Sequence, residues 1–139
     1  MIYVDNNATT AMDPAVLDAM LPFLREAYAN PSSPYTPARR AAAAIQQARD
    51  SLADVLGVSA EEISFTGGGT ESNGLAILGG LAGNPDRRQV VISAVEHACV
   101  QETVHALAAR GYQVDLIPVS AQGVLDEDAA ARLIGPQTA

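Results

Sequence analysis

The chain has 139 residues, 48% of them hydrophobic, which suits one domain with its own core and leaves too few residues for two. Sixteen acidic residues against eight basic ones give a formal net charge of −8, which argues against nonspecific binding to nucleic acid. No apolar run reaches the length of a membrane span, and no secretion signal is recognisable. The single cysteine excludes an internal disulfide framework, so we expect a cytoplasmic protein without membrane contact.

Residues 1–13 are predicted to form an N-terminal arm. Residues 1–4 are apolar and β-prone, and residues 5–10 are polar and favour neither a strand nor a helix. Asp13 followed by Pro14 is typical of a helix start, because the aspartate can cap the helix and proline suits its first turn. Six apolar residues then trace one helical face, namely Val16, Leu17, Met20, Leu21, Leu24 and Tyr28. This helix is expected to stop by Asn30.

A proline-rich loop and a long helix follow. Residues 30–37 contain three prolines among serines, a tyrosine and a threonine, which favours a structured loop. Thr36 and Pro37 repeat the pattern of a helix start, and an apolar stripe continues to Leu56. Gly57 is predicted to end this helix in the left-handed conformation.

Residues 65–73 read Phe-Thr-Gly-Gly-Gly-Thr-Glu-Ser-Asn and lie between a strand predicted over residues 62–66 and a helix predicted over residues 71–81. Three consecutive glycines allow positive φ and a close approach to a ligand. The following helix presents unpaired N–H groups at its positive end, and Thr70 adds a hydroxyl there. We call this turn with Thr70 the anion cradle, because together these donors could bind a phosphate.

The glycine pattern alone does not name the phosphate compound. A P-loop needs a lysine after its last glycine, and the dinucleotide fingerprint needs a glycine where Ser72 stands. Neither pattern is present, and a glycine-rich turn without any ligand remains the alternative.

The second half of the chain predicts an α/β fold. Residues 89–93 and 112–118 have the character of short strands, and the helix between them has an apolar stripe that ends at Gly111. A further short helix is predicted over residues 126–133. Alternating strands and helices favour parallel pairing and a three-layer sandwich with a mainly parallel sheet. Ligands then bind beyond the carboxyl ends of the strands, so residues 66–67 and 95–97 should face one crevice.

His97 follows a strand and opens a helix, so its imidazole could lie over a flat ring and move protons near neutral pH, or could simply cap the helix. Cys99 in the same first turn is predicted to serve packing, and His105 to face solvent. Glu71 and Glu96 each suit a helix dipole and are assigned no chemical role. Two histidines and one cysteine lack the spacing of a metal site.

Four motifs together resemble those of the cysteine desulfurases of the NifS type, pyridoxal-phosphate (PLP) enzymes of the class V aminotransferase group. They are residues 3–10 (Tyr-Val-Asp-Asn-Asn-Ala-Thr-Thr), 30–33 (Asn-Pro-Ser-Ser), 65–73 and 95–97 (Val-Glu-His), in the order and with the spacing of that family. The resemblance runs from residue 2 to residue 139 and covers about the first third of a family member. It implies that residues 14–139 form the N-terminal part of a PLP-dependent transferase fold type I large domain.

The resemblance also implies roles for single residues. The glycine-threonine turn of the family binds the phosphate of PLP, which assigns Gly69 and Thr70 to cofactor binding. The family histidine stacks on the pyridine ring and assists proton transfer, which assigns His97 to cofactor binding and catalysis. Asn7 and Ser33 lie in motifs that come near the active site in the family.

The chain lacks parts of the family's machinery. It contains no lysine, so it cannot bind PLP through a Schiff base. In the family that lysine, the aspartate that pairs with the pyridinium nitrogen and the nucleophilic cysteine all lie further along the sequence, and Cys99 does not match that cysteine. We therefore expect these residues alone to be inactive.

The function implied is that of the N-terminal portion of a cysteine desulfurase, which moves sulfur from L-cysteine to an enzyme persulfide, releases L-alanine and supplies iron–sulfur cluster assembly. A homodimer and an iron–sulfur scaffold protein as sulfur acceptor are the expected partners. Two alternatives stay open: another class V enzyme, such as a selenocysteine lyase or an aminotransferase, and a non-catalytic phosphate-binding or interaction module.

Overall fold

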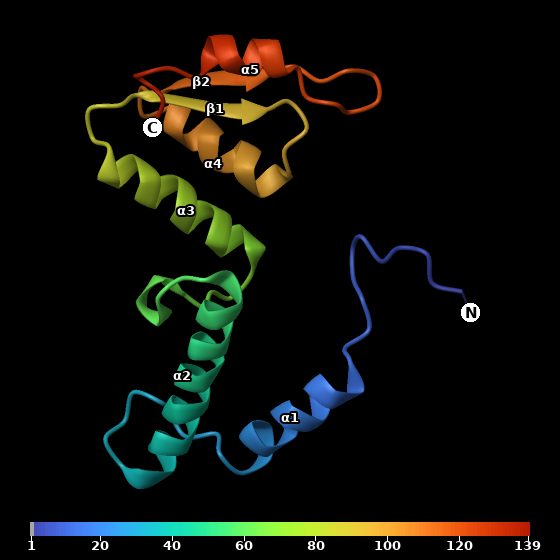
Figure 1. Cartoon of the computed structure of the whole chain (residues 1–139), viewed down its shortest axis with the longest axis vertical. Helices are drawn as coiled ribbons and strands as arrows, with labels where there is room; N and C mark the ends of the chain where they lie inside the picture. The colour runs from blue at the N-terminus through green and yellow to red at the C-terminus, as the bar shows by residue number, and fades with distance from the viewer. Residues whose placement is uncertain (1) are drawn as a thin grey trace. The chain divides into compact units, whose positions relative to one another are not determined.

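The computed structural model describes residues 2–139 and divides into two compact units, Met1–Ser64 and Phe65–Ala139 (Figure 1). Met1, the first residue of the segment predicted to be β-prone, lies outside the described residues. Residues 2–13 form neither helix nor strand, and the hydroxyls of Tyr3 and Thr9 lie 2.5 Å apart within them. The assignment of residues 1–13 as an arm and residues 14–139 as one domain part stays a prediction.

Helix α1 (Pro14–Arg25) begins where the sequence predicts. The Asp13 carboxylate accepts a hydrogen bond from the N–H of Ala15 at 2.8 Å and so caps the helix. The helix ends three residues before Tyr28, because the N–H groups of Glu26 and Ala27 both donate to the carbonyl of Pro22. Its predicted apolar face is largely uncovered, with Val16, Leu17, Met20 and Leu24 all exposed. No helix among the described residues is long and apolar enough to cross a bilayer.

Helix α2 (Thr36–Leu56) also agrees with its predicted bounds. Gly57 ends it with a φ of 69°, in the left-handed conformation that glycine adopts without strain. Ala38, Ala41 and Ala53 are its buried residues. The guanidinium of Arg40 lies 5.8 Å from the centre of the Phe23 ring, which connects α2 to α1.

The strand predicted over residues 62–66 is wrong. Glu62 belongs instead to a 3₁₀ turn, η1 (Ala60–Glu62), where its carboxylate accepts from the N–H of Ser59 at 2.9 Å and completes a capping box. Residues 63–66 are not part of any strand. A strand needs a paired neighbour, and the described residues supply none here, so β-branched and aromatic content alone did not produce one.

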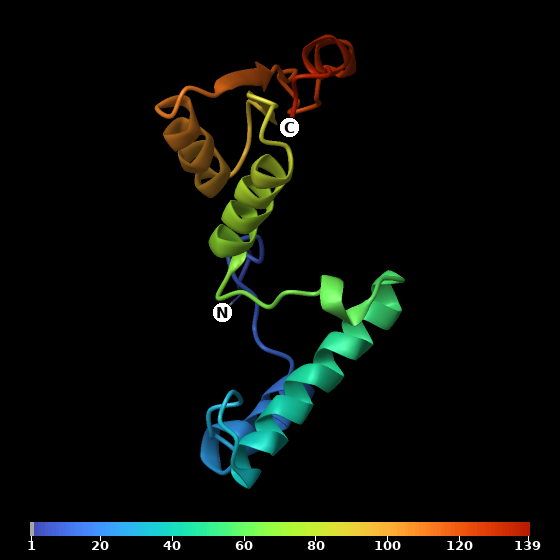
Figure 2. The ribbon, with the colours of Figure 1, turned by 90° about the vertical axis from the view of Figure 1, so that its left-hand side faces the viewer.

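The second unit has α/β architecture with a parallel sheet. Its elements are α3 (Gly69–Gly83), β1 (Gln89–Ser93), α4 (Ala98–Ala108), β2 (Gln113–Ile117) and α5 (Glu127–Leu133). Strands β1 and β2 pair in parallel from Gln89 opposite Gln113 to Ser93 opposite Ile117. Helix α4 covers one face of this sheet and α5 the other, which gives three layers (Figures 1 and 2). The predicted fold class is confirmed.

The core of the second unit lies between these layers. Its buried side chains are Leu81, Val104, Leu107, Ile117 and Ala129, and Leu107 is only 2% exposed. The other edge of β1 pairs in parallel with Thr138, where the N–H of Gln89 donates to the carbonyl of Gln137 and the N–H of Ala139 to that of Gln89. The C-terminal residues therefore extend the sheet on that side.

Candidate functional site

The sequence allows the glycines of the anion cradle more than one backbone conformation, and the structure shows which one they adopt. φ angles in the left-handed region occur at Gly57, Gly111 and Gly123, whereas Gly68, the N-cap of α3, has extended backbone with a φ of 161°. The left-handed conformation that the glycines allow is therefore not used in this turn. What the turn offers is space, because a Cβ placed on Gly68 or Gly69 would meet no atom within 4 Å. A ligand can thus approach the backbone closely at these two residues.

Several donors of the anion cradle are available. Ser72 is the first residue of α3 whose N–H pairs with a carbonyl, that of Gly68 at 3.1 Å, so the N–H groups of Gly69 and Thr70 have no partner within the helix. The hydroxyls of Thr66 and Ser72 lie 2.6 Å apart and satisfy one another. The exposed hydroxyl of Thr70 has no such partner within residues 2–139. The N–H groups of Gly69, Thr70 and Glu71 and the hydroxyl of Thr70 are therefore open at the start of α3.

One donor of the turn is already used. The Glu71 carboxylate accepts a hydrogen bond from the N–H of Gly67 at 2.6 Å and lies 3.1 Å from the position that a Gly67 Cβ would take. This contact fixes the turn that precedes α3 and leaves the donors of Gly69 and Thr70 open. Glu71 thus has a conformational role and a favourable position at the positive end of the helix.

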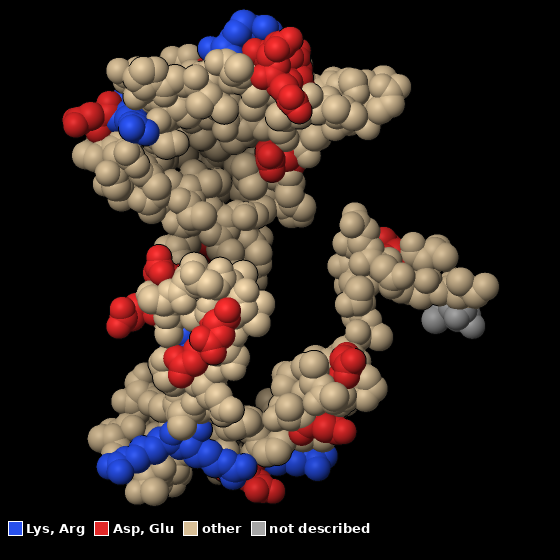
Figure 3. Space-filling view, in the orientation of Figure 1, with Lys and Arg blue, Asp and Glu red and all other residues tan. Residues whose placement is uncertain are grey.

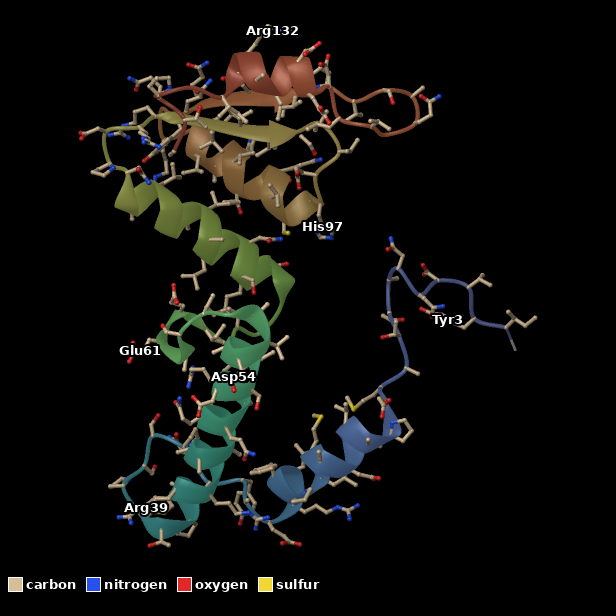
Figure 4. The ribbon with its side chains drawn as sticks, in the orientation of Figure 1. Tyr3, Arg39, Asp54, Glu61, His97 and Arg132 are labelled. Carbon is tan, nitrogen blue, oxygen red and sulfur yellow. The ribbon has the colours of Figure 1, made fainter. Side chains whose placement is uncertain are left out.

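His97 is the N-cap of α4, as the sequence indicates. Its Nδ1 accepts a hydrogen bond from the N–H of Cys99 at 3.2 Å, and the imidazole is exposed at the end of α4 that lies nearest the start of α3 (Figure 4). The nearby Glu96 accepts instead from the hydroxyl of Ser93 at 3.0 Å. The Glu96 carboxylate is therefore not hydrogen-bonded to the His97 ring.

The starts of α3 and α4 lie side by side. The side-chain amide of Asn73 on α3 donates to the Sγ of Cys99 on α4 at 3.2 Å. Thr70 precedes Asn73 by three residues, a spacing that places both on one face of a helix. The open donors of Gly69 and Thr70 and the imidazole of His97 therefore belong to the same end of the unit, beyond the carboxyl end of β1. Asn73 received no role from the sequence, because only the folded chain places it against Cys99.

The remaining candidate residues belong to other parts of the chain. His105 is exposed in the last turn of α4. Asn7 and Ser33 belong to the first unit, where the N–H of Ser33 donates to the carbonyl of Asn30 in a turn. Within the described residues, no group of three or more histidine, cysteine, aspartate or glutamate residues could hold a metal ion.

Positive charge in the second unit is remote from the anion cradle. Arg87 and Arg88 directly precede β1, Arg110 precedes β2, and Arg132 lies on α5. Figure 3 shows the blue groups of this unit at the left edge and over α5, away from the end where His97 lies in Figure 4. A phosphate bound here would therefore meet neutral donors and the positive end of the α3 dipole, with no guanidinium from residues 65–139.

The sheet and the paired helix starts define the class of the protein. Solved structures of similar fold include cysteine desulfurases. One titled "NIFS-LIKE PROTEIN" matches 99% of this chain and 38% of its own, with a TM-score of 0.91 and 36% identity. Another, titled "SspA in complex with cysteine", matches 98% of this chain and 40% of its own, with a TM-score of 0.87 and 37% identity.

The chain belongs to the family Aminotransferase class-V, whose model matches residues 2–139. A cysteine desulfurase of Bradyrhizobium diazoefficiens is 48% identical over 139 residues, which are 99% of this chain and 35% of that protein. The sequence therefore spans about a third of the length of this relative and corresponds to its N-terminal part. The predicted resemblance to the cysteine desulfurases is confirmed.

Proposed function

We propose that these residues are the N-terminal portion of a PLP-dependent cysteine desulfurase. The whole protein moves sulfur from L-cysteine to an enzyme persulfide, releases L-alanine and supplies iron–sulfur cluster assembly. The observation that carries the proposal is the contact between Asn73 and Cys99, because it joins the helix that carries Gly69 and Thr70 to the helix that begins at His97. The phosphate donors of Gly69 and Thr70 and the exposed imidazole of His97 can then contact the same ligand.

The residues present fit PLP. The space over Gly68 and Gly69 lets a phosphate reach the backbone, and the N–H groups of Gly69 and Thr70 with the Thr70 hydroxyl supply its donors. The exposed imidazole of His97 can lie against the pyridine ring and hold or move a proton at its Nε2. When bound, PLP supplies the electron sink that amino-acid chemistry requires.

The covalent steps need residues that these 139 do not contain. The sequence has no lysine to bind the cofactor covalently. Its one cysteine is half-buried and hydrogen-bonded to Asn73, and it also lies 3.1 Å from the Nδ1 of His97, so it is not presented to a substrate. Residues 2–139 therefore contribute binding and proton transfer, and by themselves they are inactive.

The proposed substrate and partners follow from the family. L-Cysteine is the substrate, and one solved structure of similar fold is described as a complex with cysteine. The protein is proposed to work in the cytoplasm as a homodimer and to deliver sulfur to an iron–sulfur scaffold protein.

A chimeric enzyme tests this function. Residues 2–139 replace the matching N-terminal part of the Bradyrhizobium diazoefficiens cysteine desulfurase, to which they are 48% identical. We expect the purified chimera to release sulfide from L-cysteine in the presence of a thiol, with alanine formed in equal amount, because this chain supplies the phosphate site and the imidazole. The two products are measured separately.

The control is the same relative without its N-terminal part, which should be inactive. A folded, PLP-loaded chimera that forms no alanine from L-cysteine would contradict the proposal. If the isolated chain still bound PLP in that case, the non-catalytic phosphate-binding module would be the better description.

A further inference from the structure

A chain of three polar groups connects α3 to the imidazole of His97. The side-chain amide of Asn73 donates to Cys99 Sγ at 3.2 Å, and this sulfur lies 3.1 Å from His97 Nδ1. The backbone N–H of Cys99 donates to the same Nδ1 at 3.2 Å. Cys99 thus contacts the ring nitrogen with both its main chain and its side chain.

These contacts determine which ring nitrogen carries the proton. A nitrogen that accepts a hydrogen bond from a backbone N–H cannot itself be protonated, so the neutral His97 ring carries its hydrogen on Nε2. The thiol of Cys99 can then act only as a donor toward Nδ1. Because the Asn73 amide donates to the sulfur and does not need its hydrogen, the S–H remains available to donate to the ring.

We propose that Asn73 and Cys99 are positioning residues that hold His97 in the Nε2–H tautomer and fix the direction of its ring. The ring's hydrogen is then on Nε2, which has no hydrogen-bond partner among the described residues, on an exposed side chain. Since Asn73 lies one turn beyond Thr70 on α3, the same contacts fix the imidazole relative to the anion cradle.

The catalytic meaning of this inference rests on the proposed function, in which His97 moves a proton next to PLP. The tautomer itself is a property of the ligand-free chain. It can therefore be measured without any cofactor, and its failure is distinguishable from a failure to bind PLP or to release sulfide.

The test is a long-range ¹H–¹⁵N correlation spectrum of the two imidazoles in the ¹⁵N-labelled chain. The spectrum is recorded under mildly alkaline conditions. We expect His97 to show an unprotonated Nδ1 and a protonated Nε2, with the Nε2–H form in excess by about tenfold or more. His105, exposed on the same helix, is the internal control and should show averaged shifts of both tautomers.

Matched variants separate positioning from general stability. Cys99→Ala keeps the backbone N–H and removes the thiol, so the tautomer ratio of His97 should fall by about threefold or more. Cys99→Ser keeps a donor and should restore the ratio. Asn73→Leu, of similar size but without a donor, should lower the ratio in the same direction, while His105 stays unchanged in every variant.

The tautomer of His97 in the unsubstituted chain tests the inference even if a variant fails to fold. A His97 with its proton on Nδ1, or with the same averaged shifts as His105, would overturn the inference. So would a Cys99→Ala variant that folds normally and leaves the tautomer ratio of His97 unchanged.

Discussion

Replacing Thr70 by valine is expected to weaken the binding of PLP to this chain by about tenfold or more. The substitution keeps the shape of the side chain and removes the hydroxyl that is open at the start of α3, and a hydrogen bond to a charged group contributes about 1.5–3 kcal/mol. Equilibrium dialysis or an absorbance titration measures the affinity. Because the chain has no lysine, the bound cofactor should keep the absorbance of the free aldehyde.

Ser72→Ala is the matched control for this prediction. Ser72 lies two residues further along α3, but its hydroxyl already pairs with that of Thr66 at 2.6 Å. Removing it should change the affinity for PLP less than twofold. Equal affinities of Thr70→Val and the unsubstituted chain would show that the phosphate is not held by the anion cradle.

Leu107→Ala is expected to destabilise the second unit by about 2–5 kcal/mol. Leu107 lies on α4, is 2% exposed and belongs to the small core between the sheet and its helices. The unit has few other large buried side chains, so the cavity removes a sizeable share of its hydrophobic stabilisation. Urea denaturation followed by circular dichroism measures the change in the free energy of unfolding.

The control is Leu75→Ala on α3, where the leucine is 56% exposed. This substitution should change the free energy of unfolding by less than about 1 kcal/mol, because little buried surface is lost. If both leucines gave the same effect, Leu107 would not be part of the core described above.

Elements with local signals could be predicted from the sequence. Asp13 before Pro14 and Gly57 after Leu56 mark helix ends through capping, and the structure has helix ends at both. These signals depend on a few neighbouring residues, which is why sequence alone contains them. Strand β1 was also predicted from its local sequence, and its bounds of Gln89–Ser93 agree with the prediction.

Features that depend on distant residues could not be predicted. Residues 62–66 have strand-like composition, yet β structure needs a paired strand, and Glu62 instead completes the capping box of Ser59. The glycines of the anion cradle permit positive φ without requiring it, and Gly68 is extended. In both cases the sequence allowed more than one backbone conformation.

The candidate site was predicted in part. The motifs indicate Gly69, Thr70 and His97, and the structure places the helices that carry them side by side. The roles of these residues stay a proposal. Cys99 was expected to serve packing, whereas its sulfur contacts both Asn73 and His97. That contact joins residues 26 positions apart, and no local pattern could have indicated it.

The most direct test of the account is a backbone amide NMR titration of this chain with PLP, repeated with pyridoxal, which lacks the phosphate. We expect PLP to shift the amide signals of Gly68, Gly69 and Thr70 and the ring signals of His97 together, and pyridoxal to leave the three amides nearly unchanged. If the largest shifts fell outside these residues, or if pyridoxal moved the three amides as far as PLP does, the claim of one phosphate-and-ring site between the starts of α3 and α4 would be contradicted.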